Sequence, residues 1–151
     1  MLKKFVFIFV VLAAIFILEQ YRLFSVLGVN PNLFLVAFLF FIFNARTFWF
    51  AALVAASLLI FVLVFSPYLA VPFAVLLLLV LASYPLKKFM TGTPFLDFLA
   101  LVLASTLVFY LLVGIFRLSS LPVGFIILEA LYNLVLGAVV WFALGERSKL
   151  K

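Results

Sequence analysis

The stretch FLDFLALVLASTLVFYLLVGIF, residues 95–116, decides the fold. It is a long apolar run whose only acidic residue, Asp97, lies near its start. The hydrocarbon core of a bilayer is about 30 Å thick, so a helix needs about 20 mainly apolar residues to cross it. The run meets that requirement and predicts a membrane-spanning helix.

Further apolar runs lie on both sides of this stretch, in a chain of 151 residues that is 72% hydrophobic. A soluble domain of this size needs far more polar surface. We therefore expect an all-α integral membrane protein with one domain, residues 1–151, and six transmembrane helices. The second run is the shortest, and it extends to residue 45 only if Arg46 reaches out to the headgroups. The expected spans are approximately 5–20, 31–45, 47–65, 68–84, 95–116 and 121–144.

The basic residues lie almost entirely in the gaps between these runs. Six spans put only Arg22 and Arg117 on one side of the membrane. Lys and Arg accumulate in short cytoplasmic loops, so the other side is cytoplasmic and holds both termini. That side receives Lys3, Lys4, Arg46, Lys87, Lys88, Arg147, Lys149 and Lys151.

Prolines and small polar residues mark the expected helix ends. Asn30 is a candidate N-cap for the second span, with Pro31 at the first helical position, where a missing N–H costs nothing. Pro85 is expected to end the fourth span. Pro94 is expected to begin the fifth span after the candidate cap Thr93.

The composition excludes several classes of function. The chain has no Cys and no His, which removes thiol nucleophiles, disulfides, the commonest metal ligands and the usual general base. The net charge of +6 is spread over the span ends, which suits anionic headgroups better than nucleic acid. No nucleophile with a base, no catalytic carboxylate pair and no phosphate-binding Gly-rich loop is present. We expect no enzyme, no cofactor and no metal site.

Glu129 is the candidate functional residue. It lies about eight residues into the sixth span, roughly 12 Å along the helix, and an ionisable group at that depth normally faces the protein interior or a cavity. Tyr132 and Asn133 follow at three and four residues, which predicts one polar stripe. Two interpretations stay open, a polar seam that holds helices together and a small binding pocket.

The other acidic residues have simpler explanations. Asp97 lies near the first turn of the fifth span, where the helix dipole favours an anion, and it is also close in sequence to Lys87 and Lys88. Glu19 and Arg22 are three residues apart and are expected to form an interfacial ion pair on one helix face.

Two stretches resemble the rod shape-determining protein MreD family. In LEQYRLFSVLGVNPNLFLV, residues 18–36, the first span ends near Gln20, and Gly28 and Pro31 match the family's Gly-Val-x-Pro-Asp-Leu element, with Asn32 in place of the Asp. The second stretch, LYNL at residues 131–134, is similar to the family's terminal Tyr-Asn element. The family's Gly-rich stretch with an intramembrane Asp is replaced by alanines at positions 51, 52, 55 and 56.

The resemblance implies a non-enzymatic scaffold of the peptidoglycan elongation complex, or elongasome, which determines cell shape. Its place would be the bacterial cytoplasmic (inner) membrane. Its partners would be an MreC-like protein and, through it, a RodA-type glycosyltransferase and transpeptidase. The family's fold resembles the S-components of energy-coupling-factor (ECF) transporters. The alternative is therefore a substrate-binding subunit of a vitamin or small-molecule transporter, with Glu129, Tyr132 and Asn133 near the ligand.

Overall fold

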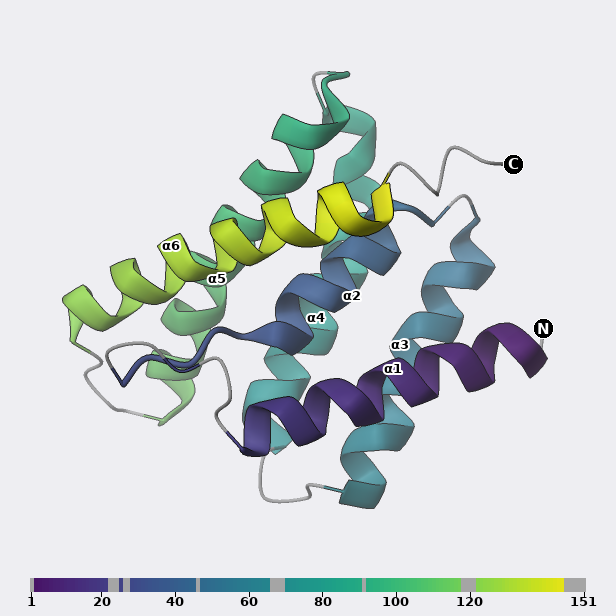
Figure 1. Ribbon diagram of the computed structural model, residues 1–151, viewed down its shortest axis with the longest axis horizontal. Helices are drawn as coiled ribbons and strands as arrows, with labels where there is room; N and C mark the ends of the chain where they lie inside the picture. The colour runs from purple at the N-terminus through teal and green to yellow at the C-terminus, as the bar shows by residue number, and fades with distance from the viewer. Residues whose placement is uncertain are drawn as a thin grey trace.

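Six α-helices make up the part of the chain that the computed structural model describes, which comprises residues 2–21, 25, 28–45, 47–65, 70–90, 92–117 and 122–145. A 3-10 turn, Lys87–Phe89, follows the fourth helix, and a π-helical turn, Trp141–Gly145, follows the sixth (Figure 1). The regular structure in these residues is therefore all-helical, as the sequence predicts. The helices are α1 (Leu2–Gln20), α2 (Leu33–Phe43), α3 (Phe48–Phe65), α4 (Ala70–Leu86), α5 (Pro94–Arg117) and α6 (Val123–Val140).

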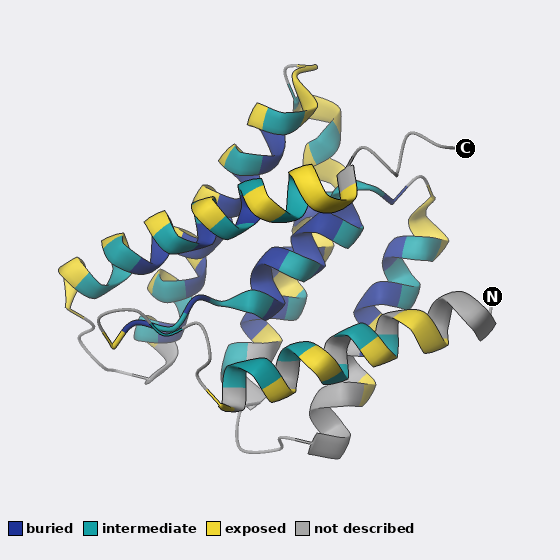
Figure 2. Ribbon diagram, in the orientation of Figure 1, coloured by how far each residue is buried: buried dark blue, intermediate teal, exposed yellow. Residues whose placement is uncertain are grey.

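Helix α2 is the core of the bundle. It lies centrally in Figure 1 and packs against each of the five other described helices. Figure 2 shows it almost entirely buried. It has only 11 residues, almost all apolar, so no face of it has to meet water. Its buried side chains are Phe34, Leu35, Val36, Phe38, Leu39, Phe40 and Ile42.

Helices α5 and α6, unlike the buried helix α2, each expose part of their surface. They lie side by side, and each keeps an apolar outer face exposed (Figures 1 and 2). In the described part of the chain two helices, Pro94–Ile115 and Val123–Leu144, are long and apolar enough to cross a membrane. Shorter apolar helices cover Phe9–Glu19, Leu33–Phe43 and Phe48–Ser57. The exposed side chains include Leu96, Leu107, Leu111, Ile115, Ile127, Leu131, Val135 and Val139.

An aromatic cluster joins α2, α5 and the π-helical turn. The Trp141 ring stacks on Phe98, with centroids 5.5 Å apart, and meets Phe43 edge-on at 5.7 Å. Phe98 also meets Phe40 edge-on at 5.9 Å. Such pairs contribute about 0.5–1.5 kcal/mol beyond their buried area, so this cluster fixes the C-terminal half of α2 against α5.

Several expected helix ends are wrong by a few residues. Helix α2 begins at Leu33, and its N-cap is Asn32, because the Asn32 side chain accepts the Leu35 N–H; Asn30 is not the cap. Helix α4 continues through Pro85 to Leu86. A proline in the last turn removes one hydrogen bond and does not prevent that turn. Pro94 does begin α5, whereas Pro122 precedes α6 in an extended conformation.

Candidate functional site

The N-terminus of α2 lies inside the protein, and side chains from α1, from α6 and from the N-cap residue accept backbone N–H groups there. Asn32 Oδ1 accepts the Leu35 N–H at 2.9 Å. Glu19 Oε1, at the end of α1, accepts the Phe34 N–H at 3.2 Å. Asn133 Oδ1, from the middle of α6, accepts the Asn32 N–H at 2.9 Å. Because the first N–H groups of a helix have no partner within the helix, these three acceptors make burial of this end possible.

The Asn133 amide extends this network to α5. Its Nδ2 donates to Thr106 Oγ1 at 3.1 Å, and the Thr106 hydroxyl donates to the Val102 carbonyl at 2.8 Å. The side chains of Asn133 and Thr106 are fully buried. A single amide therefore connects α2, α5 and α6, and it uses both its donor and its acceptor in doing so.

Glu129 lies one turn before Asn133 on the same face of α6. It is only 2% exposed, and its Oε2 accepts a hydrogen bond from the Tyr110 hydroxyl of α5. Oε1 forms no hydrogen bond with a described residue. In the described part of the chain, every side-chain oxygen or nitrogen that is fully buried does have a hydrogen-bond partner, so Oε1 is not fully buried. Oε1 is therefore open to the cavity that Glu129 lines.

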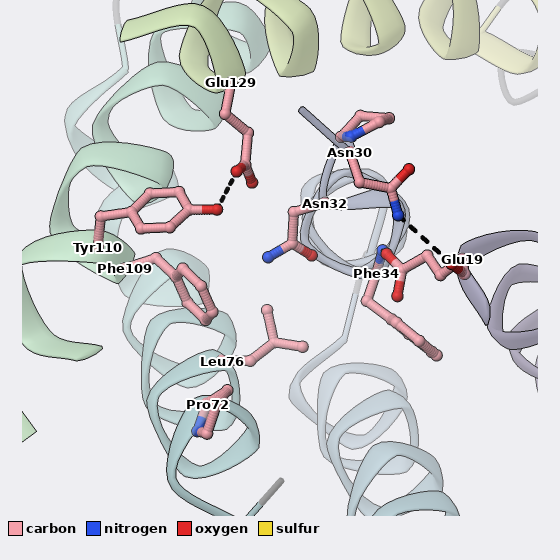
Figure 3. Close-up of a pocket in the computed structure, with 10 residues that line it drawn as sticks. Glu19, Asn30, Asn32, Phe34, Pro72, Leu76, Phe109, Tyr110 and Glu129 are labelled. Carbon is pink, nitrogen blue, oxygen red and sulfur yellow. Dashed lines mark hydrogen bonds between the residues drawn. The ribbon is translucent and has the colours of Figure 1, made fainter. Parts of the chain in front are cut away.

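That cavity has a volume of about 230 Å³ and lies between α1, α2, α4, α5 and α6. Figure 3 shows two kinds of wall around it. Carboxylate, amide and phenol groups gather on one side, and apolar side chains of α2, α4 and α5 lie on the other. The lining residues are Glu19, Asn30, Pro31, Asn32, Phe34, Pro72, Leu76, Phe109, Tyr110 and Glu129.

The opposite end of α2 is capped by a lysine. Lys87 Nζ donates to the Ala45 carbonyl at 2.7 Å and to the Ile42 carbonyl at 3.4 Å. It also lies 5.7 Å from the Tyr84 ring centroid and 5.9 Å from that of Phe43. Partial burial lowers the pKa of Lys87. The negative end of the α2 dipole thus faces a cation, and its positive end faces the Glu19 carboxyl group.

The residues that the sequence predicts for the site lie in three different parts of the structure. Glu129 and Asn133 are both buried in the interior, whereas Tyr132 is only partly buried and lies about 100° around the helix from Asn133. Tyr132 instead lines a second, apolar hollow on α6 with Leu128, Leu131 and Val135. Asp97 is buried in the first turn of α5, where its Oδ2 accepts the Gly92 N–H at 3.1 Å.

The family-motif positions gather at the N-terminal side of α2. Gly28 has φ +79°, a conformation that L side chains rarely adopt, so a glycine is required there. Pro31 and Asn32 line the cavity. The Gln20 side chain lies outside the described residues. Arg22 does too, so the predicted ion pair with Glu19 cannot be placed, and Glu19 is found bonded to α2.

Sequence reasoning assigned no role to Thr106 and Tyr110, and it gave Lys87 and Asn30 roles other than the ones they have in the structure. The first two are hydroxyl-bearing residues in an apolar run, and only their spacing of four residues hinted that they share a face of α5. The Asn30 amide donates to the Glu19 carbonyl at 3.4 Å. In the described part of the chain no three His, Cys, Asp or Glu side chains are close enough together to hold a metal ion.

Comparison with known proteins gives no match: no family model matches the chain, and neither does any curated protein or solved structure. The expected resemblance to the MreD family rests on residues 18–36 and 131–134 of the sequence. In the structure these two stretches meet, since Asn32 belongs to the first and Asn133 to the second.

Proposed function

We propose that the chain is a six-span protein of the bacterial cytoplasmic membrane with both termini in the cytoplasm. Two long apolar helices, the exposed apolar faces of α5 and α6 and the uneven distribution of Lys and Arg support this topology. Exposed Trp49 and Phe89, with Lys88 beside the latter, are typical of the interface between membrane and water.

Helix α2 fits this topology in an unusual way. At 1.5 Å per residue its 11 residues span about 16 Å, roughly half of the ~30 Å hydrocarbon core. The preceding segment, residues 28–32, completes the crossing without being helical. Such backbone is tolerated at membrane depth only where protein covers it, and Asn133 supplies a hydrogen-bond acceptor for the Asn32 N–H in this segment.

Within this topology we propose a non-enzymatic, MreD-like scaffold of the cell-shape complex. The observation that carries the proposal is the 2.9 Å hydrogen bond between Asn32 and Asn133, because it joins the two stretches that resemble MreD. In this role the apolar faces of α5 and α6 contact lipid and an MreC-like partner, which in turn brings the RodA-type glycosyltransferase and the transpeptidase.

Depletion in the host tests this function. Loss of the protein should round or swell rod-shaped cells and should separate the MreC-like partner from the synthases in co-purification. Cells that keep their shape would contradict the scaffold. Reporters active only outside the cytosol, fused to each terminus, test the topology separately; a signal from one terminus alone would overturn the six-span arrangement.

The cavity favours a second candidate, a substrate-binding subunit similar to the S-components of ECF transporters. A volume of about 230 Å³ with polar groups along one wall suits a small ligand. Under this alternative, depleted cells keep their shape and lose uptake of a vitamin or similar small molecule. The same depletion experiment therefore separates the two functions.

A further inference from the structure

We propose that the cavity at the N-terminus of α2 binds an alkylammonium group, with Glu129 as its counter-ion. This site goes beyond the scaffold role and does not depend on it, because it requires only the folded chain. The cavity, its two carboxyl groups and its apolar wall carry the inference.

The charges around the cavity favour a cation. None of its described lining residues is a lysine or an arginine, whereas Glu19 and Glu129 both line it. Glu19 faces the positive end of the α2 dipole through the Phe34 N–H. Glu129 is 2% exposed and has only the neutral Tyr110 hydroxyl as a described partner. A buried carboxyl group stays ionised only with an opposite charge beside it and is otherwise protonated, and the cavity is the space from which that charge can come.

The geometry of Glu129 selects the kind of cation. A guanidinium group binds best to both oxygens of a carboxylate at once. Oε2 of Glu129 already accepts from Tyr110, so only Oε1 is open to the cavity. One free oxygen suits the compact charge of an ammonium group, which acts as a point charge and needs no pair of acceptors.

The opposite wall suits an alkyl chain. Leu76, Pro72, Phe34 and Phe109 form it, and Figure 3 shows them across the cavity from the polar groups. The rings of Phe109 and Tyr110 add aromatic surface near the charge, which favours a cation further. The volume of about 230 Å³ exceeds the ~30 Å³ share of one water molecule several-fold. A short amine or a lysine side chain therefore fits the cavity in both size and polarity.

Ligand-observed NMR on the purified full chain in detergent tests the site. We expect n-butylammonium chloride to give a saturable signal and to raise the thermal unfolding midpoint. Uncharged n-butanol serves as the matched apolar probe and should bind at least tenfold more weakly. Equal binding of the two probes would mean that only apolar partitioning occurs, and would overturn the proposal.

Variants then locate the binding. Glu129→Gln removes the charge but keeps an oxygen for Tyr110, and it should weaken butylammonium binding at least tenfold. Asp97→Asn is the control, because Asp97 is also a buried carboxyl group but does not line the cavity; binding should be unchanged. Tyr110→Phe frees the second oxygen and should bind at least as tightly as the wild type, which keeps the test available if Glu129→Gln fails to fold. Unchanged binding in Glu129→Gln, or loss of binding in Tyr110→Phe with the fold intact, contradicts the site.

A second probe separates the two sources of an ammonium group. Nα-acetyl-lysine methylamide carries the same butylammonium chain on a peptide backbone. If it competes with butylammonium, the site accepts a lysine from a protein partner. If butylammonium alone binds, the ligand is a free amine. Binding of neither probe overturns the proposal, and because this assay involves no cell-shape partner, its failure leaves the scaffold function untouched.

Discussion

Asn32 and Asn133 are 101 residues apart in the chain, yet the Asn133 carbonyl oxygen accepts the Asn32 backbone N–H at 2.9 Å. The same side chain donates to Thr106 at 3.1 Å. The N-terminus of the most buried helix is thus completed by an amide from α6, and the integrity of the bundle depends on it.

Replacement of Asn133 by Leu should therefore destabilise the fold. It leaves the Asn32 N–H without its acceptor and the Thr106 hydroxyl without its donor, and an unpaired buried group costs about 1–3 kcal/mol. Thermal unfolding in detergent measures the effect. Tyr132→Phe is the neighbouring control, because Tyr132 faces the apolar hollow instead of this network; equal loss in both variants would contradict a specific role for Asn133.

Glu129 should tolerate Gln and reject Leu. Gln keeps an oxygen that accepts the Tyr110 hydroxyl, whereas Leu leaves that hydroxyl without its described acceptor at a cost of about 1–3 kcal/mol. Co-purification with the MreC-like partner, together with the unfolding midpoint, measures assembly and stability. If the Gln and Leu variants behave identically, the hydrogen bond between Glu129 and Tyr110 contributes neither to assembly nor to stability.

Lys87→Met should weaken the C-terminal cap of α2. Met keeps the apolar stem against Tyr84 and Phe43 but cannot donate to the Ala45 carbonyl, and a hydrogen bond from a charged donor contributes about 1.5–3 kcal/mol. Lys88→Met, at the adjacent exposed position, is the matched control. We expect a lower unfolding midpoint for Lys87→Met alone.

The same lysine should make stability depend on pH. Burial lowers the pKa of Lys87 in the folded protein below its ordinary value of 10.5. At a pH between the lowered pKa and 10.5, the unfolded chain therefore binds more protons than the folded chain. Stability from this group therefore rises with pH across that window. Unfolding midpoints measured at increasing alkaline pH should show this rise relative to Lys87→Met; a fall relative to that variant would contradict it.

Gly137 should accept Ala but not Leu. A Cβ atom built there lies 3.4 Å from Leu99 Cδ2 and 3.5 Å from Phe98 and Val102, so a methyl group just fits between α5 and α6. Ala also has a higher helix propensity, by about 1 kcal/mol. A Leu would force α5 and α6 apart and lower the unfolding midpoint. Equal midpoints for Gly137→Ala and Gly137→Leu would contradict a close contact between the two helices at this position.

The helices could be predicted from the sequence because each is an apolar run bounded by polar or breaking residues. The helix ends were harder. Asn30 and Asn32 flank Pro31, and both are good caps by residue type, so only the Leu35 N–H bond identifies Asn32. The role of Lys87 could not be predicted, because its partners lie 42 and 45 residues away on another helix end.

The candidate site was predictable only in part. Glu129 and Asn133 stood out because polar groups are costly at that depth, and the structure brings them together. Tyr132 is three residues from Glu129 but about 100° around the helix from Asn133, and its side chain lines a separate apolar hollow. For Tyr110 and Thr106 the sequence offered only their spacing of four residues, and a Thr hydroxyl in an apolar helix usually bonds back to its own backbone, as Thr106 also does with Val102.

The late position of Asn133 has a consequence for how the protein is made. In the proposed membrane setting, the translocon receives α2 long before the ribosome has synthesised the residue that satisfies the Asn32 N–H. An 11-residue segment of about 16 Å is also too short to settle across the lipid alone. We therefore expect α2 to take its place only after α6 emerges, and chains that stop before residue 133 to be removed by membrane quality-control proteases.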